Sequence, residues 1–134
     1  MVVFKGGFPM NIHQIEQVFY NEFGPIKNKF KIFELSLDEA QKSQDACVWH
    51  PGVYVWWVNS SVIRVGRHLT NSRKRALEHI SSNTGGKFDQ YASDQSLKVL
   101  LFNVIDPKDN HWVASLEIFF EKTLNPRIPS KRLG

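Results

Sequence analysis

The feature that most constrains the fold is a pair of apolar runs near the middle of the chain, separated by a polar turn. Residues 53–58 read Val-Tyr-Val-Trp-Trp-Val, and residues 62–67 return as Val-Ile-Arg-Val-Gly-Arg. β-Branched and aromatic side chains favour strands, and continuous apolar runs are typical of strands covered on both faces. The Asn-Ser-Ser segment at 59–61 is turn material. The two runs therefore predict a β-hairpin.

The length of the turn decides which side chains of this hairpin share a face. With a three-residue turn at 59–61, Trp56 faces Arg64 and Tyr54 faces Gly66. Tyr54 and Arg64 then lie on the same face, one diagonal step apart. A two-residue turn places Tyr54 and Arg64 on opposite faces, because a shift of one residue turns every side chain of a strand over. The sequence leaves both registers open.

Segments on either side of the hairpin supply helices and further strands. Apolar residues recur at helical spacing over 11–23, where Asn11 and Gln14 have the spacing of a capping box and Gly24-Pro25 ends the pattern. The other predicted elements are a run at 30–35 that is compatible with a strand, a helical turn at 38–42, a helix from 72 to about 80, a loop at 81–95, a strand at 97–105 and a helix at 112–124.

In this order the elements predict an α/β fold of the α+β type. We expect a small three-stranded antiparallel sheet flanked by helices, with an added N-terminal helix. Residues 1–50 are expected to be a helical extension packed on the core, and residues 51–134 are expected to form the core domain.

Composition fits one folded domain and limits where it works. The chain has 134 residues, of which 42% are hydrophobic and 22% are charged, enough for one apolar core. Cys47 is the single cysteine, so no intrachain disulfide can form and a reducing compartment is expected. No signal peptide is evident, and no apolar run approaches the roughly 20 residues of a membrane span. We expect a soluble, cytoplasmic protein with no membrane partner, as a monomer or a homodimer.

Basic residues are concentrated in the second half of the chain. Lys and Arg outnumber Asp and Glu by 17 to 13, and segment 62–79 contains Glu78 as its single acidic residue. Concentrated positive charge is the electrostatic footprint of nucleic-acid binding, with a solvated charged face as the alternative. The basic residues of this region are Arg64, Arg67, Arg73, Lys74 and Arg75, followed in the tail by Arg127, Lys131 and Arg132.

Glu117 is the most informative single residue. It falls within the apolar stripe of the last predicted helix, which is formed by Val113, Leu116, Phe120 and Leu124. A carboxylate in such a stripe loses its hydration, which is costly unless a cation, a metal or hydrogen-bond donors face it. The alternative is that Glu117 lies at the border of the stripe and reaches water, or pairs with a structural Arg.

Four further residues could carry chemistry. Arg75 and His79 stand one helical turn apart, where Arg can bind phosphate and His can transfer a proton, or where both can belong to a solvated helix face. Tyr54 is either a core tyrosine or a site residue. Arg64 interrupts an apolar strand and therefore requires an anionic partner, for which Glu117 or a bound phosphate would serve.

Taken together, these residues resemble the GIY-YIG nuclease family over positions 51–129. The family's fold, a three-stranded antiparallel sheet flanked by helices, agrees with the order of elements above. The residues that carry the resemblance are the tripeptides Gly52-Val53-Tyr54 and Arg64-Val65-Gly66, the helical pair Arg75 and His79, and Glu117 on the last helix.

The resemblance implies a metal-dependent endonuclease that hydrolyses phosphodiester bonds, with DNA favoured over RNA as the partner. Glu117 would hold one divalent cation, Mg²⁺ or Mn²⁺, and water and phosphate oxygens would complete its coordination. Tyr54 would help to deprotonate the attacking water, Arg75 would stabilise charge on the phosphate, and His79 would assist proton transfer or hold Tyr54 in place. Further phosphate contacts would come from Arg64, Arg67, Arg73 and Lys74.

Two positions depart from the family pattern. Arg64 stands where the second motif has a tyrosine, and its guanidinium stays protonated, so it cannot act as a general base. Pro129 aligns near the family's asparagine and offers no side-chain hydrogen bond. These departures favour an alternative, a catalytically degenerate nucleic-acid-binding module on the same fold. A third hypothesis is a protein-interaction role for an exposed patch of Trp and Phe side chains.

Overall fold

The computed structural model describes residues 9–82 and 88–129, apart from the side chains at 79, 81, 82 and 89. In this structure β2 (Gly52–Val58) and β3 (Ser61–His68) form the predicted hairpin. Its turn is two residues long. Asn59 and Ser60 both have left-handed backbones, with φ of 45° and 66°. This geometry gives a two-residue turn the twist of the flanking strands.

A β-bulge next to the turn changes the register along the rest of the hairpin. Trp57 pairs with Val62 but Trp56 pairs with Arg64, so β3 carries one extra residue between these two pairs. Beyond the bulge, Tyr54 lies opposite Gly66. The facing pairs expected from a three-residue turn are therefore present although the turn has two residues, because the bulge supplies the missing residue.

Within the described residues the sheet has four antiparallel strands in the order β1-β4-β2-β3. The expectation of three strands was wrong, because the short apolar run after the first helix joins the sheet as β1 (Phe30–Ser36). β1 pairs along the whole of β4 (Lys98–Val104), from Phe30 opposite Val104 to Ser36 opposite Lys98. β4 and β2 are central strands, whereas β1 and β3 form the two edges of the sheet.

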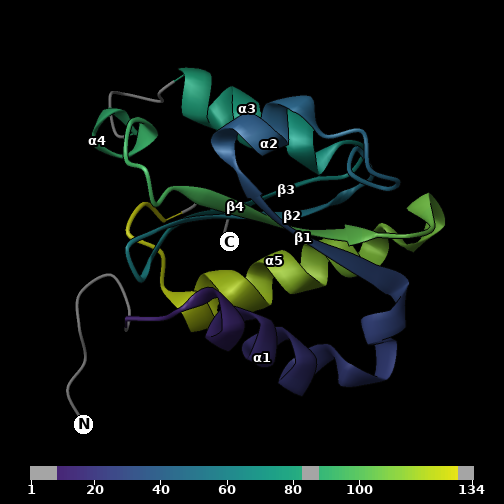
Figure 1. Ribbon diagram of the computed structural model, residues 1–134. Helices are drawn as coiled ribbons and strands as arrows, with labels where there is room; N and C mark the ends of the chain where they lie inside the picture. Colours follow the sequence, from purple (N-terminus) through teal and green to yellow (C-terminus); the bar gives the residue numbers. More distant parts are fainter. Residues whose placement is uncertain (1–8, 83–87, 130–134) are drawn as a thin grey trace, which may run out of the picture.

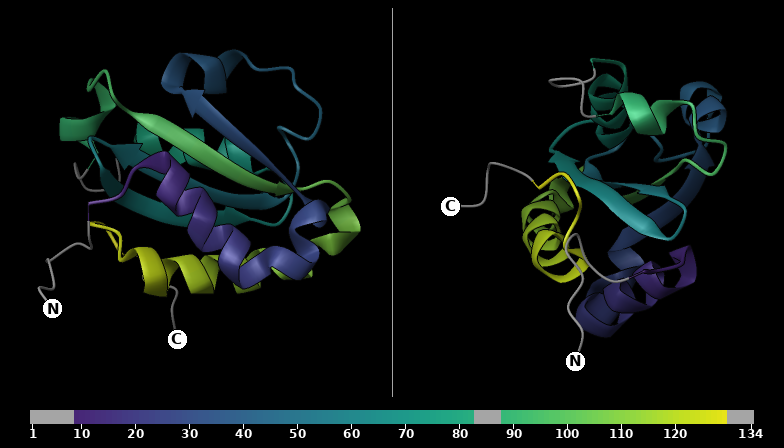
Figure 2. Two further views of the ribbon diagram at one scale, coloured as in Figure 1. Left: turned by 60° about the horizontal axis from the view of Figure 1, so that its bottom comes forward. Right: turned by 90° about the vertical axis from the view of Figure 1, so that its left-hand side faces the viewer.

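Helices cover both faces of this sheet (Figure 1). One face carries α1 (Ile12–Phe23) and α5 (His111–Leu124), which lie side by side in both views of Figure 2 and meet where the rings of Phe23 and Phe119 are 5.6 Å apart. The other face carries α2 (Leu37–Lys42), α3 (Ser72–Ser82) and α4 (Asp89–Ala92). Two 3₁₀ turns, Gly24–Lys29 and Pro107–Asp109, lead into β1 and α5.

The predicted caps set the starts of several helices. Asn11 and Gln14 form the predicted capping box of α1, with both backbone-to-side-chain bonds at 2.8 Å. Ser36 and Glu39 form a second capping box at α2, and hydrogen bonds from the Ser36 backbone and hydroxyl lower the pKa of Glu39. Asn71 accepts from the backbone N–H of Lys74 and caps α3. These bonds satisfy N–H groups that have no partner inside a helix.

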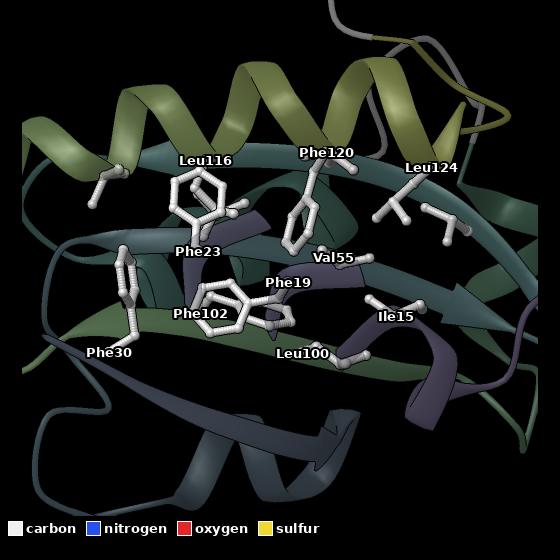
Figure 3. Close-up of a cluster of buried hydrophobic side chains, with 14 of the residues drawn as sticks. Ile15, Phe19, Phe23, Phe30, Val55, Leu100, Phe102, Leu116, Phe120 and Leu124 are labelled. Atoms are coloured by element: carbon white, nitrogen blue, oxygen red, sulfur yellow. The ribbon is translucent and has the colours of Figure 1, made fainter. Parts of the chain in front are cut away.

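The sheet separates two apolar cores. Figure 3 shows the first, in which Phe102 of β4 lies between Phe19 of α1 and Phe120 of α5, at ring distances of 5.2 and 4.9 Å. The second lies beneath α2, α3 and α4 and includes Tyr54 and Trp56 of β2. Each large apolar side chain buried in these cores contributes about 1.5–3 kcal/mol. Residues before position 51 contribute to both cores through α1, β1 and α2.

Most of the described aromatic side chains are used in these cores. No described Phe is exposed, and Trp49 is the single exposed Trp in the described part of the chain. These residues therefore do not form the broad aromatic patch that the protein-interaction hypothesis required. Among the described residues, no helix is both long and apolar enough to cross a membrane.

Candidate active site

Edge strand β3 carries basic residues of the candidate site. It runs between α3 on one face of the sheet and α5 on the other, and it contributes Arg64, Arg67 and His68, all partly exposed. The Gly66–Arg67 step of β3 is approached from both faces of the sheet, by Tyr54 at Gly66 and by Glu117 at Arg67.

From the α5 face, Glu117 reaches this step by pairing with Arg67. The Nη1 atom of Arg67 lies 2.6 Å from Oε1 of Glu117, whose side chain is 3% exposed, against 26% for Arg67. The pair explains how an ionised carboxylate is tolerated within the apolar stripe of α5. Breaking such a buried pair by removing one partner typically costs about 3–5 kcal/mol, because the other charge is left buried without compensation.

Glu121 is a second carboxylate on this face of α5 that sequence reasoning missed. It is 6% exposed and stands one turn after Glu117. The sequence pattern could have indicated that Glu121 is buried, because residues 117, 120, 121 and 124 all fall on one side of a helix. The stripe of α5 therefore buries two carboxylates rather than one.

From the α3 face, Tyr54 reaches the same step of β3. The ring of Tyr54 is 1% exposed, and a Cβ placed on Gly66 would lie 2.2 Å from both Cζ and Oη of Tyr54. The phenol hydroxyl thus lies over Gly66, one residue before Arg67. The glycine of the second tripeptide is required because the tyrosine of the first occupies the space of its side chain.

Arg64 binds the segment that follows α5. Its Nη1 atom donates to the carbonyl oxygens of Ile128 at 3.4 Å and Pro129 at 3.0 Å. Main-chain bonds hold the same segment on β3, with Arg127 N donating to Val62 O and Ile128 N to Ile63 O. Glu117 is therefore not the partner of Arg64: it pairs with Arg67, and the described partners of Arg64 are carbonyl oxygens. The Nε of Arg64 is buried and, among the described groups, has no hydrogen-bond acceptor.

The two departures from the family pattern are thus in contact with each other. Arg64 donates to the backbone carbonyl oxygen of Pro129 at 3.0 Å, so the two positions at which the motifs differ from the GIY-YIG pattern are joined by a hydrogen bond. The backbone carbonyl oxygen of a proline accepts a hydrogen bond as well as that of any other residue. In this chain the pair therefore has a structural role.

Helix α3 places its basic residues on different sides. Arg73 donates to the carbonyl oxygen of Ser43 at 2.6 Å, which turns it toward the segment after α2. Lys74 is exposed. Arg75 lies two positions from Arg73, on the opposite flank of the helix, and is 3.8 Å from Glu78 with a side chain that is 35% exposed. The side chain of His79, and the tail residues Lys131 and Arg132, lie outside the described part of the structure.

The glycine of the first tripeptide has a packing reason that the sequence did not reveal. A Cβ on Gly52 would lie 2.0 Å from Oδ1 of Asn103, a fully buried residue of β4. Asn103 accepts from the hydroxyl of Ser72 at the start of α3 and donates to the carbonyl oxygens of Cys47 and Val48. Its amide therefore ties β4, α3 and the segment before β2 together, and it satisfies groups that are costly to leave unbonded.

Some predicted site residues are brought together and others are not. Arg67 and Glu117 are in direct contact on the α5 face. Tyr54 and Arg64 share the α3 face, as the register required. Tyr54 and Glu117 lie on opposite faces of the sheet, Tyr54 against Gly66 and Glu117 against Arg67. Arg73 and Lys74 point to other parts of the surface.

Glu117 has the donor chemistry of the implied divalent cation. Carboxylate oxygens suit Mg²⁺ and Mn²⁺, and two oxygens give Glu117 capacity beyond its bond to Arg67. Within the described residues, no group of three or more His, Cys, Asp or Glu side chains is arranged to hold a metal. Such a cation would therefore have Glu117 as its protein ligand and would depend on water and phosphate oxygens for the rest.

No protein-family model, curated protein or solved structure matches the chain. The resemblance between its short motifs and the GIY-YIG pattern therefore stands on the residues themselves.

Proposed function

We propose that the protein is a divalent-metal-dependent nuclease that hydrolyses phosphodiester bonds, with DNA as the favoured substrate, and that its active site lies at the Gly66–Arg67 step of β3. The observation that carries this proposal is the Arg67–Glu117 pair at 2.6 Å, which adjoins Gly66 of β3, where the Tyr54 hydroxyl lies on the other face of the sheet. A buried carboxylate, a guanidinium and a phenol at the edge of a sheet match the groups that phosphodiester hydrolysis uses. The resemblance to the GIY-YIG pattern also assigns Tyr54 and Glu117, with Arg75 and His79 rather than Arg67 as their partners.

Each residue has a role that follows from its chemistry. Glu117 would bind the cation, which when present supplies charge stabilisation at the phosphate. Arg67 would orient Glu117 and offer its remaining N–H groups to a phosphate oxygen. Arg75, on the flank of α3 away from Arg73, would add a second positive charge. Tyr54 would accept a hydrogen bond from the attacking water and help to remove its proton.

The test is a nicking assay on supercoiled DNA with Mg²⁺ or Mn²⁺. Glu117→Gln and Tyr54→Phe are expected to reduce the rate at least about 100-fold, the size of effect typical of a removed catalytic group. Glu121→Gln is the matched control, because it neutralises a buried carboxylate one turn away on the same helix. Circular dichroism checks that all three variants fold. Cutting that persists in both Glu117→Gln and Tyr54→Phe would assign the activity to another site or to a contaminant.

A second candidate is a nucleic-acid-binding module that does not cut. The observation that favours it is Arg64, which cannot be a general base and is bonded to the carbonyl oxygens of Ile128 and Pro129. This candidate predicts DNA binding that weakens steeply as salt rises, with no cleavage in any divalent metal. The same nicking assay separates the two candidates.

A further inference from the structure

A groove with exposed apolar walls opens at the end of the sheet next to this site. It has a volume of about 370 Å³, within the range of ligand-binding pockets, and lies between the segment before β2, the turn after β3 and the start of α5. Trp49 and Leu69 stand on its walls with 45% and 44% of their surfaces exposed. Pro51 and Pro107 add further apolar lining.

The backbone holds Trp49 in this exposed position. The residue before it, Val48, is fully buried, and the carbonyl oxygens of Cys47 and Val48 accept hydrogen bonds from the Asn103 amide at 2.9 and 3.2 Å. The residue after it, His50, is held by a 2.9 Å bond between its Nδ1 and the carbonyl oxygen of Val104. Because hydrogen bonds hold the residues on both sides of Trp49, its backbone loses little conformational entropy when the indole binds a ligand.

The opposite wall is fixed in a similar way. Nδ1 of His68 accepts hydrogen bonds from the backbone N–H groups of Thr70 at 3.1 Å and Asn71 at 2.9 Å. This tight turn leaves Leu69 at its tip, pointing away from both cores. Trp49 and Leu69 line the same groove, and exposed apolar residues that share a groove indicate a binding surface, whereas single ones do not.

The groove lies within a few nucleotides of the proposed catalytic step. Leu69 follows Arg67 by two residues, which span at most about 7 Å of extended chain. Asn110, on the groove wall, precedes Glu117 by seven residues, or about 10 Å along a helix. Successive nucleotides in a stacked strand are about 3.4 Å apart. A strand with its phosphate at Arg67 therefore has a base within reach of the Leu69 part of this groove, which Trp49 also lines.

Both cations and carboxylates lie near the groove. Its nearest cation on β3 is Arg67, and Lys108 is exposed beside Pro107. Of the nearby carboxylates, Asp106 accepts from the Lys108 backbone N–H and Asp109 lies 3.6 Å from Nζ of Lys29. Aromatic side chains beside positive charge are the usual means of binding single strands, since every base has a face that can stack.

We propose that this groove holds an unpaired base of the substrate strand, stacked on Trp49 and against Leu69, next to the phosphodiester that is cut. The proposal rests on the proposed function and specifies its substrate as nucleic acid with a single-stranded or flipped-out nucleotide. In an intact duplex the bases are stacked inside and do not present a face to Trp49.

The test is binding of a fluorescein-labelled oligo(dT) of twelve nucleotides, compared with a hairpin duplex, by fluorescence anisotropy in EDTA so that no cutting occurs. Trp49→Ala is expected to weaken single-strand binding by about 5- to 150-fold, the loss typical of one base-stacking aromatic. Trp49→Phe should retain most of the affinity, and duplex binding should change less than about twofold because phosphate contacts dominate it. Oligo(U) in parallel shows whether the groove distinguishes the sugar.

Tyr20→Ala is the matched control, because Tyr20 is an exposed aromatic residue on α1, 39% exposed and outside this groove. It should leave single-strand binding unchanged. The inference is overturned if Trp49→Ala binds oligo(dT) as tightly as the parent, if duplex binding falls equally, or if the parent does not bind oligo(dT). Its failure is distinct from failure of the proposed function, since cleavage that depends on Glu117 is measured separately with metal.

Discussion

Gly66 offers a direct test of how the two tripeptides fit together. The ring of Tyr54 fills the space above it, so that a Cβ at position 66 would lie 2.2 Å from Cζ and Oη and 2.8 Å from Cε1 of the tyrosine. Real Cβ atoms do not approach other heavy atoms this closely. Because Tyr54 is 1% exposed and packed within the second core, its ring cannot move aside freely. Gly66→Ala must therefore displace either the ring or strand β3.

The expected size of the effect follows from these contacts. Overpacking a well-filled core costs about 1–3 kcal/mol. Without the clash, alanine would be favoured over glycine here by roughly 0.5–1 kcal/mol, because it restricts the unfolded chain and suits a strand better. A net loss of about 1–2 kcal/mol is expected, which lowers the melting temperature of a chain of this size by about 3–10 °C.

The assay is urea unfolding followed by tryptophan fluorescence, in a double-mutant cycle with Tyr54→Leu. Leucine lacks all three atoms that the new Cβ would meet, so Gly66→Ala in the Tyr54→Leu background is expected to be neutral or mildly stabilising. The coupling energy should be about 1–3 kcal/mol, as for residues in contact. An equal cost of Gly66→Ala in both backgrounds would refute the view that Tyr54 is the reason for the glycine.

Two further predictions concern charged groups. Arg67→Met leaves the Glu117 carboxylate buried without its partner and should lower the unfolding free energy by about 3–5 kcal/mol. Adding Glu117→Gln to this variant should recover most of the lost stability. A loss under about 1 kcal/mol in Arg67→Met alone would show that the ion pair is not needed for stability. Hydrogen bonds from the backbone N–H and hydroxyl of Ser96 lower the pKa of Asp94. Since the folded pKa is below the unfolded one, this contribution to stability is complete above about pH 4 and is lost as pH falls through the folded value. NMR titration should place the Asp94 pKa below its ordinary value and show it rising in Ser96→Ala; an unchanged pKa in that variant contradicts the assignment.

Local sequence information predicted the elements whose signals lie within a few residues of one another. The hairpin followed from two apolar runs and a polar turn, and the capping box of α1 followed from Asn11 and Gln14. The fourth strand was harder to predict, because β1 becomes a strand by pairing with β4, about 70 residues later in the chain. Its seven residues have no strong pattern of their own, so the pairing partner decides their conformation.

The register of the hairpin also depends partly on local sequence and partly on tertiary packing. Asn59 and Ser60 form the short turn with left-handed backbones, which suits Asn59 but is uncommon for a serine. The bulge between the Trp56 and Trp57 pairs lies where the strand buries apolar side chains on both faces. Turn length alone would have assigned Tyr54 and Arg64 to opposite faces. Packing against two cores overrides that assignment.

In the candidate site, too, some features follow from the sequence and others from the tertiary structure. The sequence by itself determined that Glu117 is a carboxylate inside an apolar stripe and that Arg64 interrupts a strand, because periodicity fixes which side of an element a residue occupies. Only the tertiary structure decided their partners. Glu117 meets Arg67, fifty residues earlier, and Arg64 meets the backbone of Ile128 and Pro129. A buried charge must be neutralised or hydrogen-bonded by whatever group the fold brings beside it, and that group is set by the packing of α5 and its following segment against β3.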